Sequence, residues 1–284
     1  MTIDDPAEHR SASRAGWESA SQGWSRCGER IAAFGMPVAE RMLEGVGLEP
    51  GQRVLEIAAG LGDVGLMAAA RVGPRGSVIV SDQAEGMLAA ARERAQARGV
   101  ENVEFRLLDA ESLDLDTASV DVALCRSGYM LMVDPPAALR ETRRVLRPGG
   151  RLALAVWDEP QRNPWATAPM AVMLERGLAE PPAPGAPGMF ALADRARLRG
   201  ALEECGFTEI EIEPVSVHRR HATVEDFWQV SLELSRVLAS LVEGLREEEV
   251  AAVRAALRAR LEPFTDARGA VDLPGSSLVA IAGA

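Results

Sequence analysis

Three glycines and an aspartate mark the segment of this chain best suited to binding a small ligand. Gly60, Gly62 and Gly65 follow the apolar run VLEIAA, and Asp82 follows the next apolar run. Glycines between a strand and a helix let a ligand approach the backbone, and the amide groups at the start of the helix attract an anion. The spacing matches the dinucleotide-binding fingerprint, in which the acidic residue binds the hydroxyl groups of a ribose.

Two further carboxylates help to identify the kind of ligand that this segment would bind. Glu56 lies inside the first apolar run, four residues before Gly60. Its charge is unfavourable near a pyrophosphate but suits a ligand that carries an ammonium group. Asp109 ends a third apolar run, where its carboxylate can accept a hydrogen bond from the amino group of an adenine. These two residues favour a nucleoside with a cationic substituent.

The elements that must position these residues can be read from the periodicity of the chain. Five strands are expected, at 53–58, 77–81, 103–108, 120–125 and 151–157. Between them, helical spacing of apolar residues occurs at 65–71, 84–98 and 136–146. This alternation predicts an α/β fold with a Rossmann-like, mostly parallel sheet and helices on both faces.

The rest of the chain is expected to be mainly helical. Further helices are expected within 7–48, 194–205 and 223–262, and two more strands at 209–221 and 277–281. Pro214 should mark a bulge or an edge of the first of these strands. The proline- and glycine-rich segment 181–188 should form a loop.

The composition excludes several kinds of chemistry. The chain has 284 residues and a formal net charge of −11, and all 31 of its basic residues are arginine. Without lysine there is no Schiff-base or pyridoxal-phosphate catalysis and no Walker-type phosphate loop. An acidic surface repels phosphate backbones, so nucleic acid is not an expected partner.

Cysteine usage and hydropathy indicate the compartment. Cys27, Cys125 and Cys205 are far apart and form no metal-ligand or disulfide pattern, so we expect no metal site and a reducing environment. The first residues contain no apolar segment of a secretory signal, and no run reaches the roughly 18 apolar residues of a membrane span. We therefore expect a cytoplasmic protein.

The ordered motifs resemble those of class I S-adenosylmethionine-dependent methyltransferases, specifically the type 11 and ubiquinone/menaquinone-methyltransferase-like group. The resemblance covers about residues 52–158, through VLEIAAGLGDVG, SDQAEGML, LLDAESL and RVLRPGGRLALAVW. It implies a seven-stranded sheet with an antiparallel last strand. It also implies one methyltransferase domain over 1–284, with an N-terminal helical cap (1–50), a cofactor-binding core (51–158) and a C-terminal half (159–284).

The resemblance assigns S-adenosylmethionine as the cofactor, S-adenosylhomocysteine as its product, and no metal. The loop from Ala58 to Gly62 should approach the methionine portion, with Glu56 nearby. The other expected cofactor contacts are the ribose ligand Asp82, the adenosine neighbours Gln83 and Met87, the adenine contacts Asp109 and Ala110, and Arg126 beside the sulfonium. Ala59 stands at a family position often occupied by cysteine, and Glu56 at one where aspartate is also common; neither difference disturbs the backbone geometry.

The sequence offers few candidates for a general base. His218 and His221 end a strand at the expected active-site edge. The alternative is that they are solvent-facing residues of the arginine-rich segment HRRH. Tyr129, the only tyrosine, follows the fourth strand and could equally be a packing residue. Asp158 reads as a cap or loop residue. Transfer of an activated methyl group needs alignment and exclusion of water more than it needs a base.

The acceptor is expected to bind to the variable helical segments, with inserts at about 159–190 and 222–270. Apolar and aromatic residues there suggest a small lipophilic or aromatic acceptor, such as a phenol, a quinol or a natural-product intermediate. The candidate contacts are Trp17, Trp24, Tyr129, Trp165, Phe190, Phe227 and Trp228. Each could instead pack a lid onto the sheet.

Three functions remain open from the sequence. The first is methyl transfer to an oxygen, carbon or nitrogen nucleophile of a small molecule. The second is an NAD(P)-dependent oxidoreductase that uses the literal glycine fingerprint. The third is a non-catalytic protein that binds S-adenosylmethionine. The oligomeric state is open as well, and a homodimer is possible.

Overall fold

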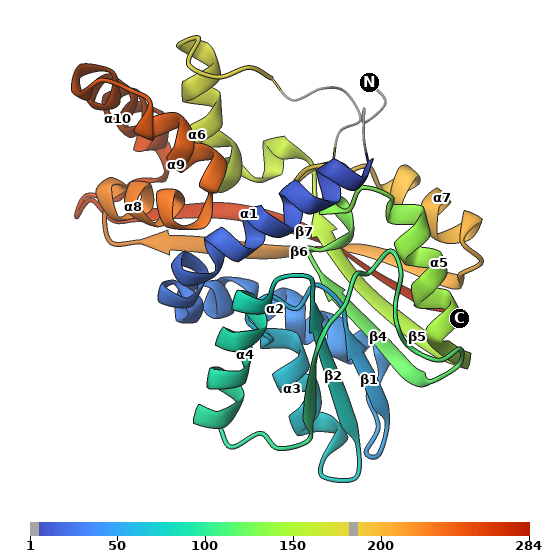
Figure 1. Ribbon diagram of the computed structural model, residues 1–284. Helices are drawn as coiled ribbons and strands as arrows, with labels where there is room; N and C mark the ends of the chain where they lie inside the picture. Colours follow the sequence, from blue (N-terminus) through green and yellow to red (C-terminus); the bar gives the residue numbers. More distant parts are fainter. Residues whose placement is uncertain (1–5, 182–186) are drawn as a thin grey trace.

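A single seven-stranded sheet runs through the computed structural model, which describes residues 6–181 and 187–284 (Figure 1). The strands are β1 (Arg53–Glu56), β2 (Ser77–Asp82), β3 (Val103–Leu107), β4 (Val120–Arg126), β5 (Leu146–Trp157), β6 (Thr208–His221) and β7 (Val271–Gly283). Their order is β3-β2-β1-β4-β5-β7-β6. The five strands β3, β2, β1, β4 and β5 are parallel, and β7 is antiparallel to both of its neighbours. The expected α/β fold is confirmed.

Helices cover both faces of the sheet. Helices α3 (Asp63–Val72) and α4 (Glu85–Ala97) connect β1 to β2 and β2 to β3, towards one edge of the sheet. Helix α5 (Pro135–Val145) connects β4 to β5, in the opposite direction along the sheet. Since such crossovers are right-handed, α3 and α4 lie on one face and α5 on the other. Helix α2 (Gly28–Val46) packs beside α3, and α7 (Arg195–Glu204) packs against β6 (Figure 1).

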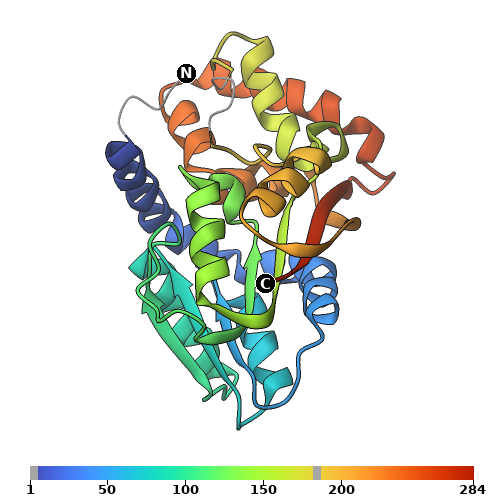
Figure 2. The same ribbon diagram turned by 90° about the vertical axis from the view of Figure 1, so that its right-hand side faces the viewer.

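The remaining helices come from the N-terminus and from the two inserts. They are α1 (Pro6–Arg26), α6 (Pro164–Glu175), α8 (Val224–Leu234), α9 (Arg236–Glu243) and α10 (Glu247–Leu261), with short 3-10 turns η1 (Tyr129–Leu131), η2 (Pro160–Arg162) and η3 (Glu262–Phe264). Figure 2 shows α6 and α8 to α10 gathered at one end of the molecule. Within residues 6–181 and 187–284, no helix is both long and apolar enough to cross a membrane.

Several boundaries differ from the expected ones. Strand β1 stops at Glu56 rather than at residue 58, because Ala58 turns the chain with a φ of 51°. Strand β7 begins at Val271 rather than at residue 277, because its first half pairs with the end of β6. Pro214 does lie on an edge strand, but the register shift in β6 falls between Thr208 and Glu211.

The start of β5 also differs from the expected boundary at residue 151. The strand begins at Leu146 and passes through the Pro-Gly-Gly turn, where its pairing with β4 shifts register. Of the loop expected at 181–188, residues 182–186 lie outside the described residues.

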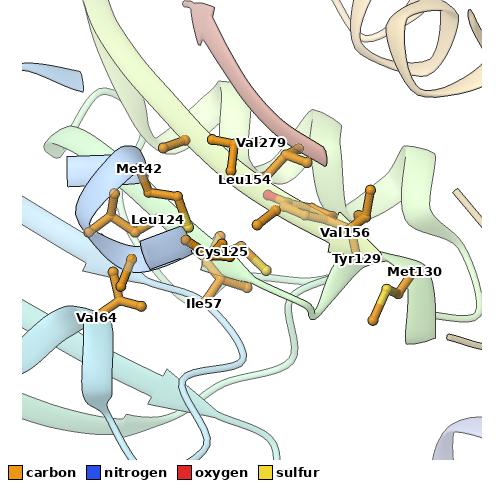
Figure 3. Close-up of a cluster of buried hydrophobic side chains, with 14 of the residues drawn as sticks. Met42, Ile57, Val64, Leu124, Cys125, Tyr129, Met130, Leu154, Val156 and Val279 are labelled. Atoms are coloured by element: carbon orange, nitrogen blue, oxygen red, sulfur yellow. The ribbon is translucent and has the colours of Figure 1, made fainter. Parts of the chain in front are cut away.

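The main core extends over both faces of the sheet, and one part of it lies between α2 and the sheet. Met42 on α2 is fully buried, as are Leu124 and Leu154 on the adjacent strands β4 and β5 (Figure 3). Burying a leucine or methionine side chain contributes about 1.5–3 kcal/mol to stability. This packing fixes the carboxyl ends of β1, β4 and β5, where the polar residues of the candidate site begin.

Candidate cofactor and acceptor site

Backbone hydrogen bonds join the carboxyl ends of four parallel strands into one rigid edge. The amide of Ile57 donates to the carbonyl of Leu124 at 2.8 Å, and the amide of Ala59 donates to that of Ser81 at 2.9 Å. The amide of Leu108 donates to the carbonyl of Asp82 at 3.0 Å. The structure therefore brings together most of the residues expected to contact a cofactor, which end or follow β1, β2, β3 and β4.

The loop between β1 and α3 offers open backbone to a ligand. Gly60 has a φ of 54°, and a Cβ atom placed on it would meet no atom within 4 Å. Ala58 adopts a similar left-handed conformation although it carries a side chain. Backbone strain of this kind is concentrated at binding sites. The open space beside Gly60 is the cradle in which a ligand can contact the chain closely.

Glu56 carries a buried carboxylate with no compensating charge bound to it. The residue is 2% exposed, and its Oε2 atom has no hydrogen-bond partner among the described residues. Burial and the nearby Asp63 raise the pKa of Glu56 to about 8, although Arg126 and the amides of Gly65 and Val64 act in the opposite direction. A buried acceptor without a donor is costly, so this site is suited to a ligand cation that supplies one.

Glu56 also occupies the place that a dinucleotide would need. Its carboxylate lies against the first turn of α3, where a Cβ atom on Gly65 would collide with Oε2. In dinucleotide-binding folds the pyrophosphate sits at this helix N-terminus. An anion would here face a buried carboxyl group, and this disfavours the binding of a nicotinamide dinucleotide to the glycine loop.

Asp82 is held in place by the backbone on both sides. Its carboxylate accepts hydrogen bonds from the amides of Gly60 at 2.8 Å and Ala84 at 3.0 Å, while burial raises its pKa. The side chain of Gln83 donates to Ser13 Oγ of α1 at 3.3 Å, and Met87 is buried in the small apolar cluster that includes Leu61. The strand ends and α1 thus meet around the expected ribose position.

Asp109 begins a turn whose shape is fixed by its own side chain. Its Oδ1 accepts a hydrogen bond from the amide of Glu111 at 2.9 Å, and Ala110 between them packs against the main core. Glu111 accepts hydrogen bonds from the amide of Val133 at 2.8 Å and from Arg10 Nε of α1 at 2.7 Å. Helix α1 is therefore tied to the expected adenine loop as well.

Arg126 lies at the same edge but is bound to a residue that the sequence motifs did not single out. Its Nη2 donates to Asp63 Oδ2 at 3.1 Å, and Arg94 Nη2 donates to Asp63 Oδ1 at 2.6 Å. Asp63 directly follows the glycine loop, which is the only local signal that could have identified it. The four side chains of Glu56, Asp63, Arg94 and Arg126 form one charge cluster beside the loop.

Three of the candidate bases already have hydrogen-bond partners within the fold. Tyr129 is fully buried, and its hydroxyl group is 2.6 Å from Thr142 Oγ1, which is the environment of a packing residue (Figure 3). Burial raises the pKa of Tyr129 well above its usual value. His218 lies on the exposed side of β6 and pairs with Asp272 at 2.9 Å. Asp158 caps the loop after β5, accepting from Ser276 Oγ at 2.7 Å.

His221 has a different environment from His218. Its Nδ1 is 3.0 Å from Asp226 Oδ2, and its buried Nε2 has no hydrogen-bond partner within the described parts of the chain. Burial and the nearby Arg219 lower the pKa of His221 to about 4, so the ring is neutral at pH 7. An imidazole oriented by a carboxylate, with a free nitrogen, has the form of a general base.

The candidate acceptor residues fall into two groups. Trp17 and Trp24 pack edge to face at 5.3 Å, Trp228 is buried under α10, and Phe190 packs against the main core, so these four join elements together. Trp165 instead packs against Phe34 and Trp157, two aromatic residues not among the expected contacts. Trp165 and Phe227 both contact the side chain of Arg219, as does Phe34.

Metal ligands do not gather at this edge. Among the described residues, no group of three or more His, Cys, Asp and Glu side chains is placed to hold a metal ion. The three cysteines are all buried and free. The polar side chains present are instead those that suit an organic ligand.

Comparison with known proteins agrees with this geometry. A family model described as a methyltransferase domain matches residues 48–174. The ubiquinone/menaquinone biosynthesis C-methyltransferase UbiE of Ectopseudomonas mendocina is 40% identical over 115 residues, which are 40% of this chain and 45% of that protein. The nocamycin O-methyltransferase of Saccharothrix syringae is 37% identical over 140 residues, 49% of this chain and 50% of that protein.

The chain thus spans about half the length of these relatives. Among solved structures, a Bacillus halodurans C-125 protein provisionally named a methyltransferase superposes with a TM-score of 0.57. The alignment covers 86% of this chain and 97% of that protein at 21% identity. The residues that match the family model, 48–174, contain the parallel strands β1 to β5 and the glycine loop.

Proposed function

We propose that this chain, whose residues 48–174 match a family model described as a methyltransferase domain, is a class I S-adenosylmethionine-dependent methyltransferase that transfers a methyl group from that cofactor to a small molecule. The observation that carries the proposal is Glu56, whose buried Oε2 has no hydrogen-bond partner among the described residues. S-adenosylmethionine brings an ammonium group and a sulfonium to this edge, and both favour a carboxylate. NAD(P) would bring a pyrophosphate.

The remaining cofactor contacts follow from the strand ends. The backbone of Ala58 to Gly62 would lie along the methionine portion, and Asp82 would bind the ribose. Gln83 and Met87 would flank the adenosine, Asp109 and Ala110 would hold the adenine edge, and Arg126 would lie beside the sulfonium end. These assignments are supported by the position of each residue at one edge of the sheet.

The protein's part in the reaction is alignment and exclusion of water. The cofactor supplies a methyl group that is already activated by the positive sulfur. The strand ends would hold the cofactor, and α1, which is tied to the strand ends by the contacts of Ser13 with Gln83 and of Arg10 with Glu111, would cover it. Enclosure of this kind strengthens every charge interaction in the site and prevents side reactions with water.

The acceptor we propose is a small lipophilic or aromatic molecule with an oxygen, carbon or nitrogen nucleophile. Trp157, Trp165 and Phe34 lie within 5.6 Å of one another, measured between ring centroids, at the end of β5. Aromatic side chains of this kind bind flat apolar molecules. The names of the two relatives, one acting in quinone biosynthesis and one on nocamycin, support a phenol, quinol or natural-product intermediate.

Two other functions remain alternatives to be tested. An NAD(P)-dependent oxidoreductase is disfavoured by the position of Glu56 at the start of α3. A protein that binds S-adenosylmethionine without catalysis would have the same cofactor edge. We further propose that the protein acts in the cytoplasm without nucleic acid, since its three cysteines are free and its net charge is −11.

Calorimetry tests the cofactor assignment. S-adenosylmethionine and S-adenosylhomocysteine should bind with micromolar affinity, and NADH and NADPH should not bind. Binding of the nicotinamide cofactors alone would refute the proposal. Transfer of a radiolabelled methyl group to any member of a panel of phenols, quinols and aromatic acids would distinguish an enzyme from a non-catalytic binding protein.

A further inference from the structure

Arg219 is the one residue of the HRRH segment whose charged side chain points towards the aromatic residues proposed to bind the acceptor. Along β6, His218 and Arg220 point to the opposite side, where both pair with Asp272. Strand alternation places Arg219 on the same face as the buried Val217 and His221. The side chain is partly buried between β6 and the helices α2, α6 and α8.

Three aromatic rings surround the guanidinium group of Arg219. Its Cζ atom lies 5.0 Å from the ring centroid of Trp165, 5.8 Å from that of Phe34 and 6.0 Å from that of Phe227. We refer to these three residues as the aromatic cage. A guanidinium has five N–H donors, yet the side chain of Arg219 makes no hydrogen bond or ion pair with any described residue, and its contacts are those with the three rings.

Among the described residues, no acidic side chain near Arg219 is free to neutralise its charge. Asp226 is the neighbouring carboxylate, but Arg30 donates to both of its oxygens at 2.8 Å, and His221 Nδ1 is 3.0 Å away. Burial lowers the pKa of Arg219 to about 10, which still leaves the group protonated at pH 7. With a neutral His221 and an Asp226 balanced by Arg30, the cage holds one unbalanced positive charge.

The cage adjoins the cofactor edge. Phe34 stacks on Trp157, the last residue of β5, at 5.6 Å between ring centroids. The next residue of α2, Gly35, lies so close to Arg126 that a Cβ atom there would be 2.8 Å from its Cζ. The aromatic cage and the expected sulfonium region are therefore on either side of one turn of α2.

We propose that Arg219 binds an anionic oxygen group of the methyl acceptor, a carboxylate or an enolate attached to a flat unsaturated ring. The cage would stack on the ring and the guanidinium would donate two hydrogen bonds to the anion, the geometry in which arginine binds carboxylates best. This inference rests on the proposed methyltransferase function and defines its substrate class. Arg219 is thus a specificity-determining residue.

The competing explanation is that Arg219 only stabilises the fold through cation–π contacts. The two roles predict opposite effects of Arg219→Met, which keeps the apolar length of the side chain and removes its charge. If the guanidinium group binds the acceptor, the variant loses an unpaired, partly buried charge, so the protein without ligand keeps or increases its Tm. If the guanidinium group only stabilises the fold through its cation–π contacts, the Tm of the variant falls.

A matched pair of probes tests the proposal directly. 2-Naphthoate and its neutral analogue 2-naphthamide are titrated by calorimetry into the full chain, with and without S-adenosylhomocysteine, for wild type, Arg219→Met and the neighbouring control Arg220→Met. We expect wild type and the control to bind the carboxylate about ten-fold more tightly than the amide, a difference of about 1.4 kcal/mol. Arg219→Met should lose that preference and keep its Tm.

Three results would overturn the inference. They are equal or undetectable binding of both probes to wild type, a carboxylate preference that survives Arg219→Met, and a lower Tm for Arg219→Met than for Arg220→Met. Binding of S-adenosylhomocysteine is measured in the same samples. If the product binds while the probes do not discriminate, the acceptor class is wrong and the methyltransferase proposal stands.

Discussion

Arg126 on β4 and Asp63 at the start of α3 form an ion pair at 3.1 Å, with side chains that are only 16% and 8% exposed. Because Arg94 binds the other oxygen of Asp63, one carboxylate balances two guanidinium groups. We expect Asp63→Asn to lower the free energy of unfolding by about 3 kcal/mol, since it leaves two arginines without their charge partner. Urea unfolding followed by circular dichroism measures this loss.

The control for this prediction is an exposed ion pair on α4. Glu85 and Arg92 are both more than one third exposed, so Glu85→Gln should change stability by less than about 0.5 kcal/mol. A loss for Asp63→Asn that is no larger than that of Glu85→Gln would show that the buried cluster does not hold α3 to β4.

The buried carboxyl of Glu56 predicts an unusual dependence of stability on pH. Its pKa of about 8 in the folded protein lies above the ordinary value of 4.5, so the native state keeps a proton that the unfolded chain loses. Stability from this group is therefore fully present below pH 4.5 and is lost as the pH rises towards 8. In Glu56→Gln this part of the decline should be absent, and the variant should melt higher than wild type at pH 8.

The same variant tests the cofactor site. A ligand ammonium stabilises the ionised form of Glu56, so wild type should bind S-adenosylmethionine more tightly as the pH rises from 6 to 8. Glu56→Gln should bind it at least about ten-fold more weakly and lose that trend. Undiminished affinity in a variant of higher Tm would remove Glu56 from the site, with Glu85→Gln as the control for loss of an acidic side chain.

The sheet and the loops at its edge could be predicted because they depend on local sequence. Apolar runs of strand length, glycines between a strand and a helix, and an acidic residue after the next strand each define their own conformation. Strands β1 to β4 and the crossover helices α3, α4 and α5 were accordingly found within about two residues of their expected positions, whereas β5 and β7 begin earlier than expected. The seven-stranded sheet and its antiparallel last strand were expected from the family resemblance, whereas the order of the strands was not predicted.

The partners of the charged side chains could not be predicted in the same way. Arg219 and His218 are adjacent in an arginine-rich run, yet one faces an aromatic cage and the other pairs with Asp272. The difference depends on helices α2, α6 and α8, which lie far away in the sequence. Asp63 was missed for the same reason, because Arg94 and Arg126 reach it from two other elements.

The close packing of Gly65, in the first turn of α3, against Glu56 leads to a further prediction. A Cβ atom there would collide with the carboxylate of Glu56 and lie 3.0 Å from Val80 Cγ2. Gly65→Ala should cost about 1–3 kcal/mol of stability through overpacking and should displace Glu56. Its affinity for S-adenosylhomocysteine, measured by calorimetry, should fall together with its Tm.

Gly200 on α7 provides the matched control. A Cβ atom on Gly200 would meet nothing within 4 Å, and alanine favours a helix over glycine by about 1 kcal/mol. Gly200→Ala should therefore be neutral or stabilising and should bind the cofactor like wild type. Equal behaviour of the two variants would contradict the close approach of α3 to Glu56.

Tyr129 should prove to be a packing residue. Its hydroxyl group lies 2.6 Å from Thr142 Oγ1, which itself donates to the carbonyl of Ala138 at 2.8 Å. Tyr129→Phe should lose about 1 kcal/mol of stability and leave methyl transfer within two-fold of wild type. Thr142→Val removes the partner and should have the same effect. A Tyr129→Phe variant that is stable but loses most of its activity would instead indicate a catalytic hydroxyl.

The buried imidazole of His221 predicts a dependence of stability on pH that is opposite to that of Glu56. Its folded pKa of about 4 is below the ordinary 6.5, so between these values the unfolded chain binds a proton that the native state excludes. Stability is therefore lost as the pH falls from 6.5 towards 4, and His221→Gln should lack this decline, whereas exposed His218→Gln should keep it. Comparing kcat for the two variants separates a base from a core residue. A side chain only 2% exposed fits a core residue, so we expect kcat to change less than Tm.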